Sequence, residues 1–253
     1  MNFIFRAVYE VQEFFLLSVR AVSNVFRKPR YYSDALLQMD AIGVGSLMIV
    51  ALTGFFTGAV LALQSAKSLK SFGAVGLTGQ LVSLSLIKEL GPVLTALMIA
   101  GRNGSGIASE LGSMVVTEQI SAMRALGTDP TRKLVTPRVF AATTMVPLLT
   151  VMADLFGLLG GWLVSAYRLR LSTNLYWSSA LKGLDYKNVV EGLSKPFIFG
   201  FIIAIVGCYC GLRTYGGTQG VGRSTTQAVV LSSILVIAAD FFVGKIMLDF
   251  LYH

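Results

Sequence analysis

Charged side chains are scarce in this sequence. Asp, Glu, Lys and Arg make up 13% of its 253 residues, about half of what a soluble domain of this size carries. The run from Ala41 to Ala66 has no ionisable side chain over 26 residues, and about 20 apolar residues are enough to cross a bilayer. The scarcity excludes an ordinary soluble protein and predicts an integral membrane protein.

Histidine and cysteine are also nearly absent. The one histidine, His253, is the last residue, and the two cysteines, Cys208 and Cys210, lie inside an apolar run. A histidine-based metal site or catalytic dyad within the chain is therefore not expected. The phosphate-binding pattern GxxxxGK[ST] is missing too, and the stretch Gly101–Gly106 is better interpreted as small residues that allow close helix packing. We expect no metal and no cofactor in this chain, and no ATP hydrolysis by the chain alone.

The net charge of +8 does not indicate nucleic-acid binding. The basic residues lie between apolar runs, as determinants of membrane topology do, and do not form one basic face. The cluster Arg27, Lys28 and Arg30 precedes the first apolar run. We therefore predict a cytoplasmic N-terminus and, with an odd number of spans, an outer C-terminus.

The apolar runs predict an all-α membrane protein with two regions. Residues 1–40 form an N-terminal amphipathic region, in which Arg6, Glu10, Glu13 and Arg20 recur at helical spacing and predict a helix in the membrane interface. Residues 41–253 form the transmembrane domain. Its five predicted spans cover about 41–66, 76–100, 139–166, 196–213 and 225–250.

The second span carries the most distinctive residues. The chain from Leu77 to Val116 reads as nearly continuous helix. Gly91 and Pro92 predict a bend, because Pro92 lacks an N–H and leaves the carbonyl of Lys88 without its usual backbone donor.

Lys88 and Glu89 are expected near the middle of the bilayer, where a charge is costly and usually faces protein or a wet cavity. Adjacent residues lie about 100° apart on a helix, so we predict that one faces a partner helix and the other a cavity. The alternative is a purely structural charge pair. Two further acids, Asp154 and Asp240, lie inside the third and fifth spans. Mutual structural satisfaction and a proton relay both fit them, and the structural role is favoured.

The segment between the second and third spans predicts a short amphipathic helix of about three turns. Thr117 is the expected N-cap, with Glu118 in the first turn, and Gly127 ends the helix. Ile120, Met123 and Leu126 fall on one stripe. The pattern fits equally a helix that lies on lipid and one that docks into a soluble partner.

Two further patterns carry less information. Gly54 and Gly58 form a small-xxx-small pattern that indicates tight helix packing or a dimer seam. The segment 168–195, with Tyr176 and Trp177, is basic and aromatic and predicts an outer interfacial helix.

The stretch Leu86–Ala141, LIKELGPVLTALMIAGRNGSGIASELGSMVVTEQISAMRALGTDPTRKLVTPRVFA, closely resembles the signature region of the MlaE/YrbE permeases. GVGRSTTQAVV, Gly220–Val230, is similar to the same family's stretch before its last span. These permeases are membrane subunits of lipid ABC transporters associated with MCE proteins. Several relatives have Arg where this chain has Lys88, and a lysine meets a phosphate only as a point charge.

The resemblance implies a homodimer in the bacterial inner membrane that binds a cytoplasmic ATPase dimer, where ATP binds, and supports a periplasmic MCE ring. It implies that phospholipid or a related lipid occupies a cavity beside Glu89, a role connected with lipid asymmetry of the outer membrane. The helix Thr117–Leu126 would be the coupling helix. We accordingly expect the ATPase contact and the lipid cavity to include the following residues: Glu118, Gln119, Ile120, Met123 and Leu126 for the ATPase, and Lys88, Glu89, Leu61, Leu63 and Gln64 for the lipid.

Two other functions compete with this prediction. An ion-coupled secondary transporter of an amphipathic substrate could use Lys88, Glu89, Asp154 and Asp240, but we find no internal repeat of the kind that many such folds carry. A membrane enzyme acting on lipid would need a dense cluster of Asp, His or Ser groups, and the sequence shows none. A neighbouring gene for a Walker-motif ATPase would favour the permease.

Overall fold

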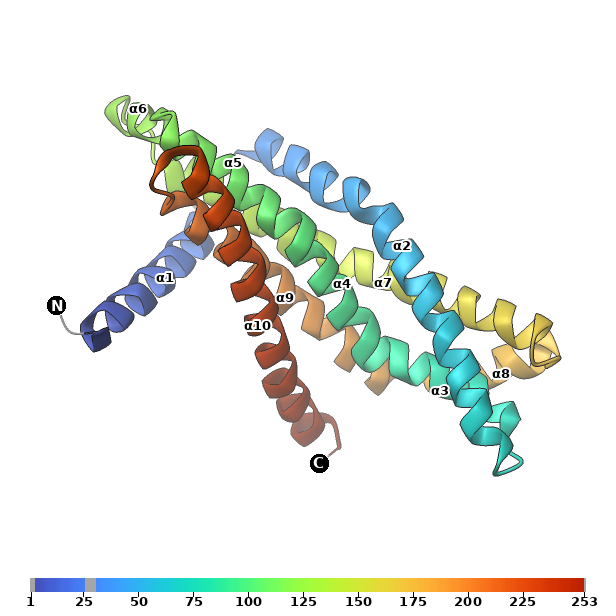
Figure 1. The fold of residues 1–253 in the computed structure, drawn as a ribbon. Helices are drawn as coiled ribbons and strands as arrows, with labels where there is room; N and C mark the ends of the chain where they lie inside the picture. Colours follow the sequence, from blue (N-terminus) through green and yellow to red (C-terminus); the bar gives the residue numbers. More distant parts are fainter. Residues whose placement is uncertain (1–2, 26–30, 253) are drawn as a thin grey trace. The chain divides into compact units, whose positions relative to one another are not determined.

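The structure, a computed structural model, describes residues 3–25 and 31–252. Within these residues it is all helical and contains no strand, as the sequence predicts. The predicted basic cluster Arg27, Lys28 and Arg30 lies outside the described residues. The α-helices, shown in Figure 1, are α1 (Phe3–Val25), α2 (Tyr32–Lys70), α3 (Thr78–Ser85), α4 (Gly91–Ile99), α5 (Ser105–Val116), α6 (Gln119–Ala125), α7 (Thr136–Tyr167), α8 (Thr173–Gly183), α9 (Tyr186–Leu212) and α10 (Gly217–Tyr252).

Within the described residues, five helical segments are long and apolar enough to cross a membrane, which confirms the predicted number of spans. Each is longer than the apolar run that predicted it, although the fourth ends one residue before the predicted end. For example, the helix of the first span begins at Tyr32, so the polar stretch before Ala41 continues directly into it. The five segments are Tyr32–Lys70, Val75–Val116, Thr131–Tyr167, Tyr186–Leu212 and Gly217–Phe250.

The second span is continuous, as predicted, but its helical geometry changes twice. A π-helical turn, Leu86–Leu90, separates α3 from α4, and a second one, Ala100–Gly104, separates α4 from α5. The first turn ends directly before Gly91 and Pro92, where the sequence predicts a bend. π turns mark places where the regular hydrogen-bond ladder is interrupted, often at functional sites.

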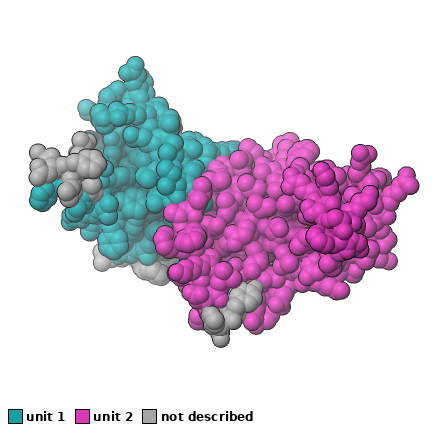
Figure 2. All heavy atoms as spheres, turned by 60° about the horizontal axis from the view of Figure 1, so that its bottom comes forward, with its two compact units in different colours: residues 1–42, 99–145, 200–236 teal, residues 43–98, 146–199, 237–253 magenta. Residues whose placement is uncertain are grey.

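The chain forms two compact units, coloured separately in Figure 2. Unit 1 comprises residues 1–42, 99–145 and 200–236. Its apolar core includes Ile107 and Leu111 of α5, Val139 of α7 and Ile205 of α9. α1 joins this core through Ala21, which is buried.

The polar side chains of α1 also have protein partners within unit 1. Glu10 and Glu13 approach Arg213, with N···O distances of 4.0 and 3.8 Å, and Tyr9 donates a hydrogen bond to Glu13 at 2.7 Å. The predicted polar stripe is therefore used in part by protein. Whether α1 also lies in a membrane interface stays a prediction.

Unit 2 comprises residues 43–98, 146–199 and 237–253. Its α2 and α7 are in close contact: an added Cβ at Gly54 would collide with the backbone of Ala153, and one at Gly58 with the backbone of Gly157. Backbones can approach this closely only where side chains are small. The Gly54–Gly58 pattern thus serves packing within the chain.

In unit 2, α3 and α8 lie side by side (Figure 1). Ser172 caps α8 by accepting a hydrogen bond from the Leu175 backbone N–H at 3.3 Å. Tyr176 is buried in the apolar core against Val82 and Leu158, and whether the segment 168–195 lies at the outer membrane interface stays a prediction. The Tyr176 hydroxyl donates to the Leu158 carbonyl at 3.1 Å, and burial raises the pKa of the phenol.

The short helix after the second span differs from the prediction. α6 has seven residues, about two turns, and its N-cap is Glu118, whose backbone is left-handed at φ 58° and whose side chain makes no capping hydrogen bond. Thr117 cannot be the cap because its hydroxyl bonds back to the Ser113 carbonyl, extending α5. Gly127, with φ +76°, ends the helix as predicted.

Candidate functional site: a charge cluster within the spans of unit 2

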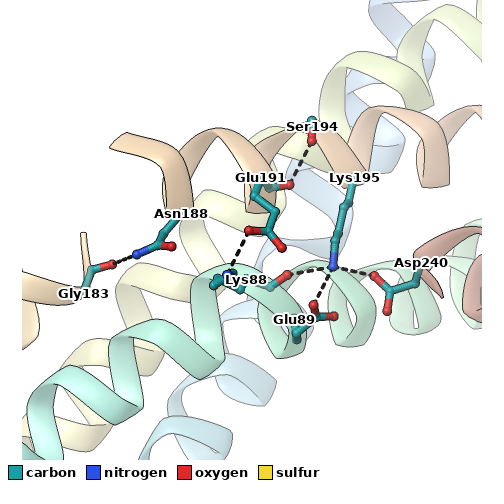
Figure 3. Close-up of polar contacts among 8 residues, drawn as sticks. All are labelled: Lys88, Glu89, Gly183, Asn188, Glu191, Ser194, Lys195 and Asp240. Atoms are coloured by element: carbon teal, nitrogen blue, oxygen red, sulfur yellow. Dashed lines mark hydrogen bonds and ion pairs between the residues drawn. The ribbon is translucent and has the colours of Figure 1, made fainter. Parts of the chain in front are cut away.

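Five charged side chains from three helical segments of unit 2 meet in one cluster (Figure 3). They are Lys88 and Glu89 from the first π turn, Glu191 and Lys195 from α9, and Asp240 from α10. All five belong to segments that can span a membrane. Charges at such depth persist where they are paired or face a polar cavity.

Lys195 is the centre of the cluster. Its side chain is fully buried, at 0% exposure, and its ammonium lies 2.8 Å from Glu89 Oε1 and 2.9 Å from Asp240 Oδ1. It also donates to the Lys88 carbonyl oxygen at 3.0 Å. The ammonium thus forms ion pairs with two carboxylates and donates a hydrogen bond to one backbone carbonyl.

The contact with the Lys88 carbonyl follows from Pro92. Proline cannot donate to the carbonyl four residues before it, and that carbonyl belongs to Lys88. In the structure, the buried Lys195 ammonium replaces the missing backbone donor. The carbonyl that Pro92 leaves without its backbone donor thus supplies one of the three oxygen atoms around the buried Lys195 ammonium.

Lys88 points to a different partner from Glu89. Its ammonium lies 2.9 Å from Glu191 Oε2, and the Glu191 side chain is almost fully buried. Glu191 and Lys195 are four residues apart on α9, so one face of this helix holds both counter-ions. Lys88 and Glu89 therefore do not pair with each other. Each forms an ion pair with a different residue of α9.

Exposure within the cluster is uneven. Glu89 keeps 51% of its side-chain surface exposed, whereas Lys195 has none. Lys88 is mostly buried at 23% exposure. Two ammonium groups and three carboxylates leave the cluster with one formal negative charge, and the most accessible carboxylate is Glu89. The arrangement can present a carboxylate to a ligand while a buried cation holds it in place.

The sequence predicted part of this cluster and missed the rest. Lys88 and Glu89 were predicted as site residues, and Asp240 as a buried acid with a structural partner, which is Lys195. Glu191 and Lys195 were missed because the fourth span was predicted to begin at 196. A Glu and a Lys four residues apart, directly before Pro196, were the available signal for a helix that starts earlier.

The remaining predicted lipid-cavity residues lie elsewhere on α2. Leu61 packs against the apolar core of unit 2, and Leu63 and Gln64 are exposed. The ion pairs that Lys88 and Glu89 form with Glu191 and Lys195 go to α9. The structure therefore does not bring Leu61, Leu63 and Gln64 into the cluster, and their role stays a prediction.

The residues predicted to contact an ATPase divide into two groups. Ile120 is buried at 4% exposure and Met123 packs half-buried beside it in the core of unit 1. Glu118, Gln119 and Leu126 are exposed, with Leu126 at 83%. The predicted stripe therefore divides. Ile120 and Met123 pack α6 against the core of unit 1, whereas Leu126, with Glu118 and Gln119, is exposed and can contact a partner.

With five membrane-crossing helices and a charge cluster inside them, the chain is a multi-pass membrane protein of the permease class. The family model for the permease MlaE matches residues 35–246, so the chain belongs to the MlaE permease family.

Relatives named as permease proteins match most of the chain. A probable ABC transporter permease protein of Rickettsia felis is 45% identical over 236 residues, which is 93% of this chain and 91% of the relative. A probable ABC transporter permease protein of Synechocystis is 42% identical over 85% of this chain and 81% of its own length. The intermembrane phospholipid transport system permease protein MlaE of Haemophilus influenzae is 34% identical over 98% of both chains.

Proposed function

We propose that this chain is the membrane-spanning subunit of an ABC transporter that moves phospholipid, or a related lipid, between the bacterial inner membrane and a periplasmic MCE protein. Family membership and the name of the Haemophilus relative support the class of transporter and the class of cargo. The observation that carries the proposal is the charge cluster, in which an accessible Glu89 is held by the buried Lys195.

The cluster suits the head group of a lipid. Apolar chains can travel along the hydrocarbon-like surface of the spans, whereas a charged head needs a few polar groups at membrane depth. Glu89 can accept hydrogen bonds from an ammonium, and Lys88 can meet a phosphate as a point charge. Such contacts are strong because screening by salt is weak at this depth.

The proposal assigns energy supply to other subunits. ATP would bind to a separate cytoplasmic ATPase dimer, and two copies of this chain would form the membrane part, with the N-terminus of each copy cytoplasmic and α1 in the membrane interface. α6 would couple the two layers through its exposed residues Glu118, Gln119 and Leu126.

The coupling proposal is best tested at Leu126. A Met123→Asp change would place a charge against the core of unit 1 and so confuse folding with docking, whereas Leu126 is 83% exposed. Leu126→Asp should weaken co-purification of the ATPase at unchanged yield of permease, because a charge would be desolvated at the contact. Leu181→Asp on α8, also at an exposed leucine, is the matched control and should leave the complex intact.

The transport proposal is tested with the complex in lipid vesicles. Lipid transfer should require ATP and the partner ATPase, and the isolated chain should hydrolyse no ATP. Transfer that proceeds without ATP and stops when an ionophore collapses the ion gradients would instead support the ion-coupled transporter. ATP hydrolysis by the purified chain alone would contradict the assignment of ATP hydrolysis to a separate subunit.

A further inference from the structure

A polar pocket in unit 1 brings two arginines and a glutamate together. It is a cavity of about 230 Å³ bordered by α1, the end of α9 and the first turns of α10. Glu10, Arg213, Tyr215 and Arg223 are among its lining residues. The volume lies below the about 300–1,000 Å³ of drug-sized sites, so the pocket suits a small polar group.

The turn between α9 and α10 holds both arginines at this pocket. The Thr214 hydroxyl donates to Ser224 Oγ at 2.9 Å, and both side chains are buried. Gly220 lies so close to the Tyr215 carbonyl that a Cβ atom there would collide with it. These two contacts tie the start of α10 to the residues that follow α9. The two guanidinium groups are therefore presented by a packed turn and not by a loose connection.

Arg213 is positioned by Tyr209 and keeps donors for a ligand. Its Nη1 atom donates to the Tyr209 hydroxyl, which itself donates to the Glu10 carbonyl at 3.3 Å. Carboxylate oxygens of Glu10 and Glu13 are 4.0 and 3.8 Å from its guanidinium nitrogens. A charge-assisted hydrogen bond is about 2.7–2.9 Å long, so neither carboxylate occupies an N–H group of Arg213. A guanidinium has several such groups, and 39% of this side chain is exposed.

Arg223 has no carboxylate partner among the residues that the structure describes. Its Nη1 atom donates to the Tyr215 hydroxyl at 3.3 Å, and its side chain is exposed. Two guanidinium groups at one pocket, one of them without a carboxylate partner, favour an anion with several oxygen atoms. A phosphate fits, because the planar fork of N–H groups matches its oxygens bidentately.

Glu10 adds a second requirement. Its carboxylate belongs to the same lining, and 46% of its side chain is exposed. A ligand that is only negative is repelled by Glu10, whereas a ligand that carries an ammonium beside its phosphate meets a group of opposite sign at each end.

The position of the pocket indicates where such a ligand is found. The pocket lies where two membrane-crossing segments are joined, one ending at Leu212 and the next beginning at Gly217. Connections between spans lie at the membrane surface, at the level of the lipid head groups. A head group that contains both a phosphate and an ammonium can therefore reach the pocket from the membrane.

We propose that this pocket binds a phosphoethanolamine group, with its phosphate held by Arg213 and Arg223 and its primary ammonium directed at Glu10. The group is either the head of a membrane phospholipid or the free soluble compound, two sources that competition distinguishes. The pocket belongs to unit 1, and its occupation does not depend on a transport role of the charge cluster in unit 2.

Native mass spectrometry of the purified full chain measures the binding. Three phospholipids with identical acyl chains are titrated: phosphatidylethanolamine, phosphatidylcholine and phosphatidylglycerol. The first carries N–H donors on its ammonium, the second carries a positive charge without N–H donors, and the third has no cation. We expect half-saturation by phosphatidylethanolamine at a concentration at least about fivefold below that of either other lipid.

Three variants locate the two charges of the ligand. Arg223→Gln should weaken the binding of phosphatidylethanolamine about tenfold, because it removes charge-assisted hydrogen bonds to the phosphate. Arg124→Gln, at an exposed arginine of α6 outside the lining, removes the same net charge and should leave binding unchanged. Glu10→Gln should abolish the preference for phosphatidylethanolamine over phosphatidylglycerol, because it removes both the attraction of the ammonium and the repulsion of the anion.

Soluble O-phosphoethanolamine, added as a competitor, identifies the source of the group. Displacement of the lipid at concentrations within about tenfold of the lipid's own half-saturation assigns the free compound as the ligand. Displacement only at higher concentrations assigns the phospholipid, whose acyl chains add to the binding.

Three results would overturn the proposal. Tighter binding of phosphatidylglycerol than of phosphatidylethanolamine by the unmodified chain would show a purely anionic site. Equal binding of all three lipids that Arg223→Gln leaves unchanged would show that bulk lipid alone fills the pocket. A preference for phosphatidylethanolamine that survives Glu10→Gln would also contradict the proposal, and this variant decides if Arg223→Gln yields no folded protein.

Discussion

Two buried cations, Lys195 in unit 2 and Arg138 in unit 1, are stabilised by different sets of partners. The Lys195 ammonium is shared by Glu89, Asp240 and the Lys88 carbonyl, which come from two other helical segments. Arg138, near the start of α7, has one carboxylate partner among the described residues, Glu110 at 2.7 Å. It otherwise donates to the carbonyl of Leu134, which lies in a further π turn, Thr131–Val135, directly before α7.

The carboxylate partners differ only in part in their access to water. Glu110 and Glu89 keep 54% and 51% of their side-chain surface exposed, whereas Asp240 keeps 20%. Lys195 is fully enclosed; Asp240 Oδ1 meets its ammonium as an ion pair only, and the Arg138 Nε atom has no hydrogen-bond partner among the described residues. A buried charge that loses its partner is costly, and the cost falls when the remaining group can be hydrated. Arg138 thus forms a local pair, whereas Lys195 joins three helical segments.

The largest effect is expected for Lys195→Met. Removing the shared cation leaves Asp240, whose side chain is only 20% exposed, uncompensated beside Glu89, at a cost of about 3–5 kcal/mol in the free energy of unfolding. Thermal unfolding of the purified protein measures the loss. Lys182→Met, at an exposed lysine of α8, is the control; equal stability of the two variants would contradict the central place of Lys195.

A smaller effect is expected for Arg138→Met. Glu110 can be hydrated once its partner is gone, so we expect a loss of about 1–3 kcal/mol by the same measurement. Adding Glu110→Gln should recover part of the loss by removing the unpaired charge. If Arg138→Met costs as much as Lys195→Met, the distinction between a local pair and a shared cation is wrong.

The smallest effect is expected for Pro92→Ala. The new N–H can bond the Lys88 carbonyl in the regular helical pattern and so competes with Lys195 for that acceptor. The new backbone hydrogen bond nearly offsets the weakened contact with Lys195, and we expect the free energy of unfolding to change by no more than about 1 kcal/mol. A loss as large as that of Lys195→Met would mean that the π turn itself, and not the ion pairs, holds this part of unit 2 together.

Hydrophobic patterning predicted much of this architecture. The uncharged run Ala41–Ala66 was enough to place the first span, and Pro92 was enough to predict that the Lys88 carbonyl would need another partner. It placed the start of α9 about ten residues late, because span boundaries were drawn where charges appear. A boundary drawn at the first charge is wrong where paired charges lie inside a span, so Glu191 and Lys195 were missed.

The turn before α6 was missed for a different reason. A Thr before a Glu resembles a capped helix start, but Thr117 bonds back into α5 and Glu118 adopts a left-handed backbone. Neither feature has a strong sequence signal, since Glu rarely adopts this conformation. The division of Ile120 and Leu126 between core and surface follows from this turn.

We propose that the charge cluster handles lipid as well as holding helices together. The most direct test is the rate of ATP-driven lipid transfer by the reconstituted complex carrying Glu89→Gln, which keeps hydrogen bonding to Lys195 but removes the accessible negative charge. Lys88→Ala, measured in parallel, removes the positive charge that pairs with Glu191. We predict a folded complex with unchanged basal assembly and a lipid transfer rate altered at least severalfold in both variants. Wild-type transfer rates in both, or loss of the folded protein in both, would contradict a transport role for the cluster.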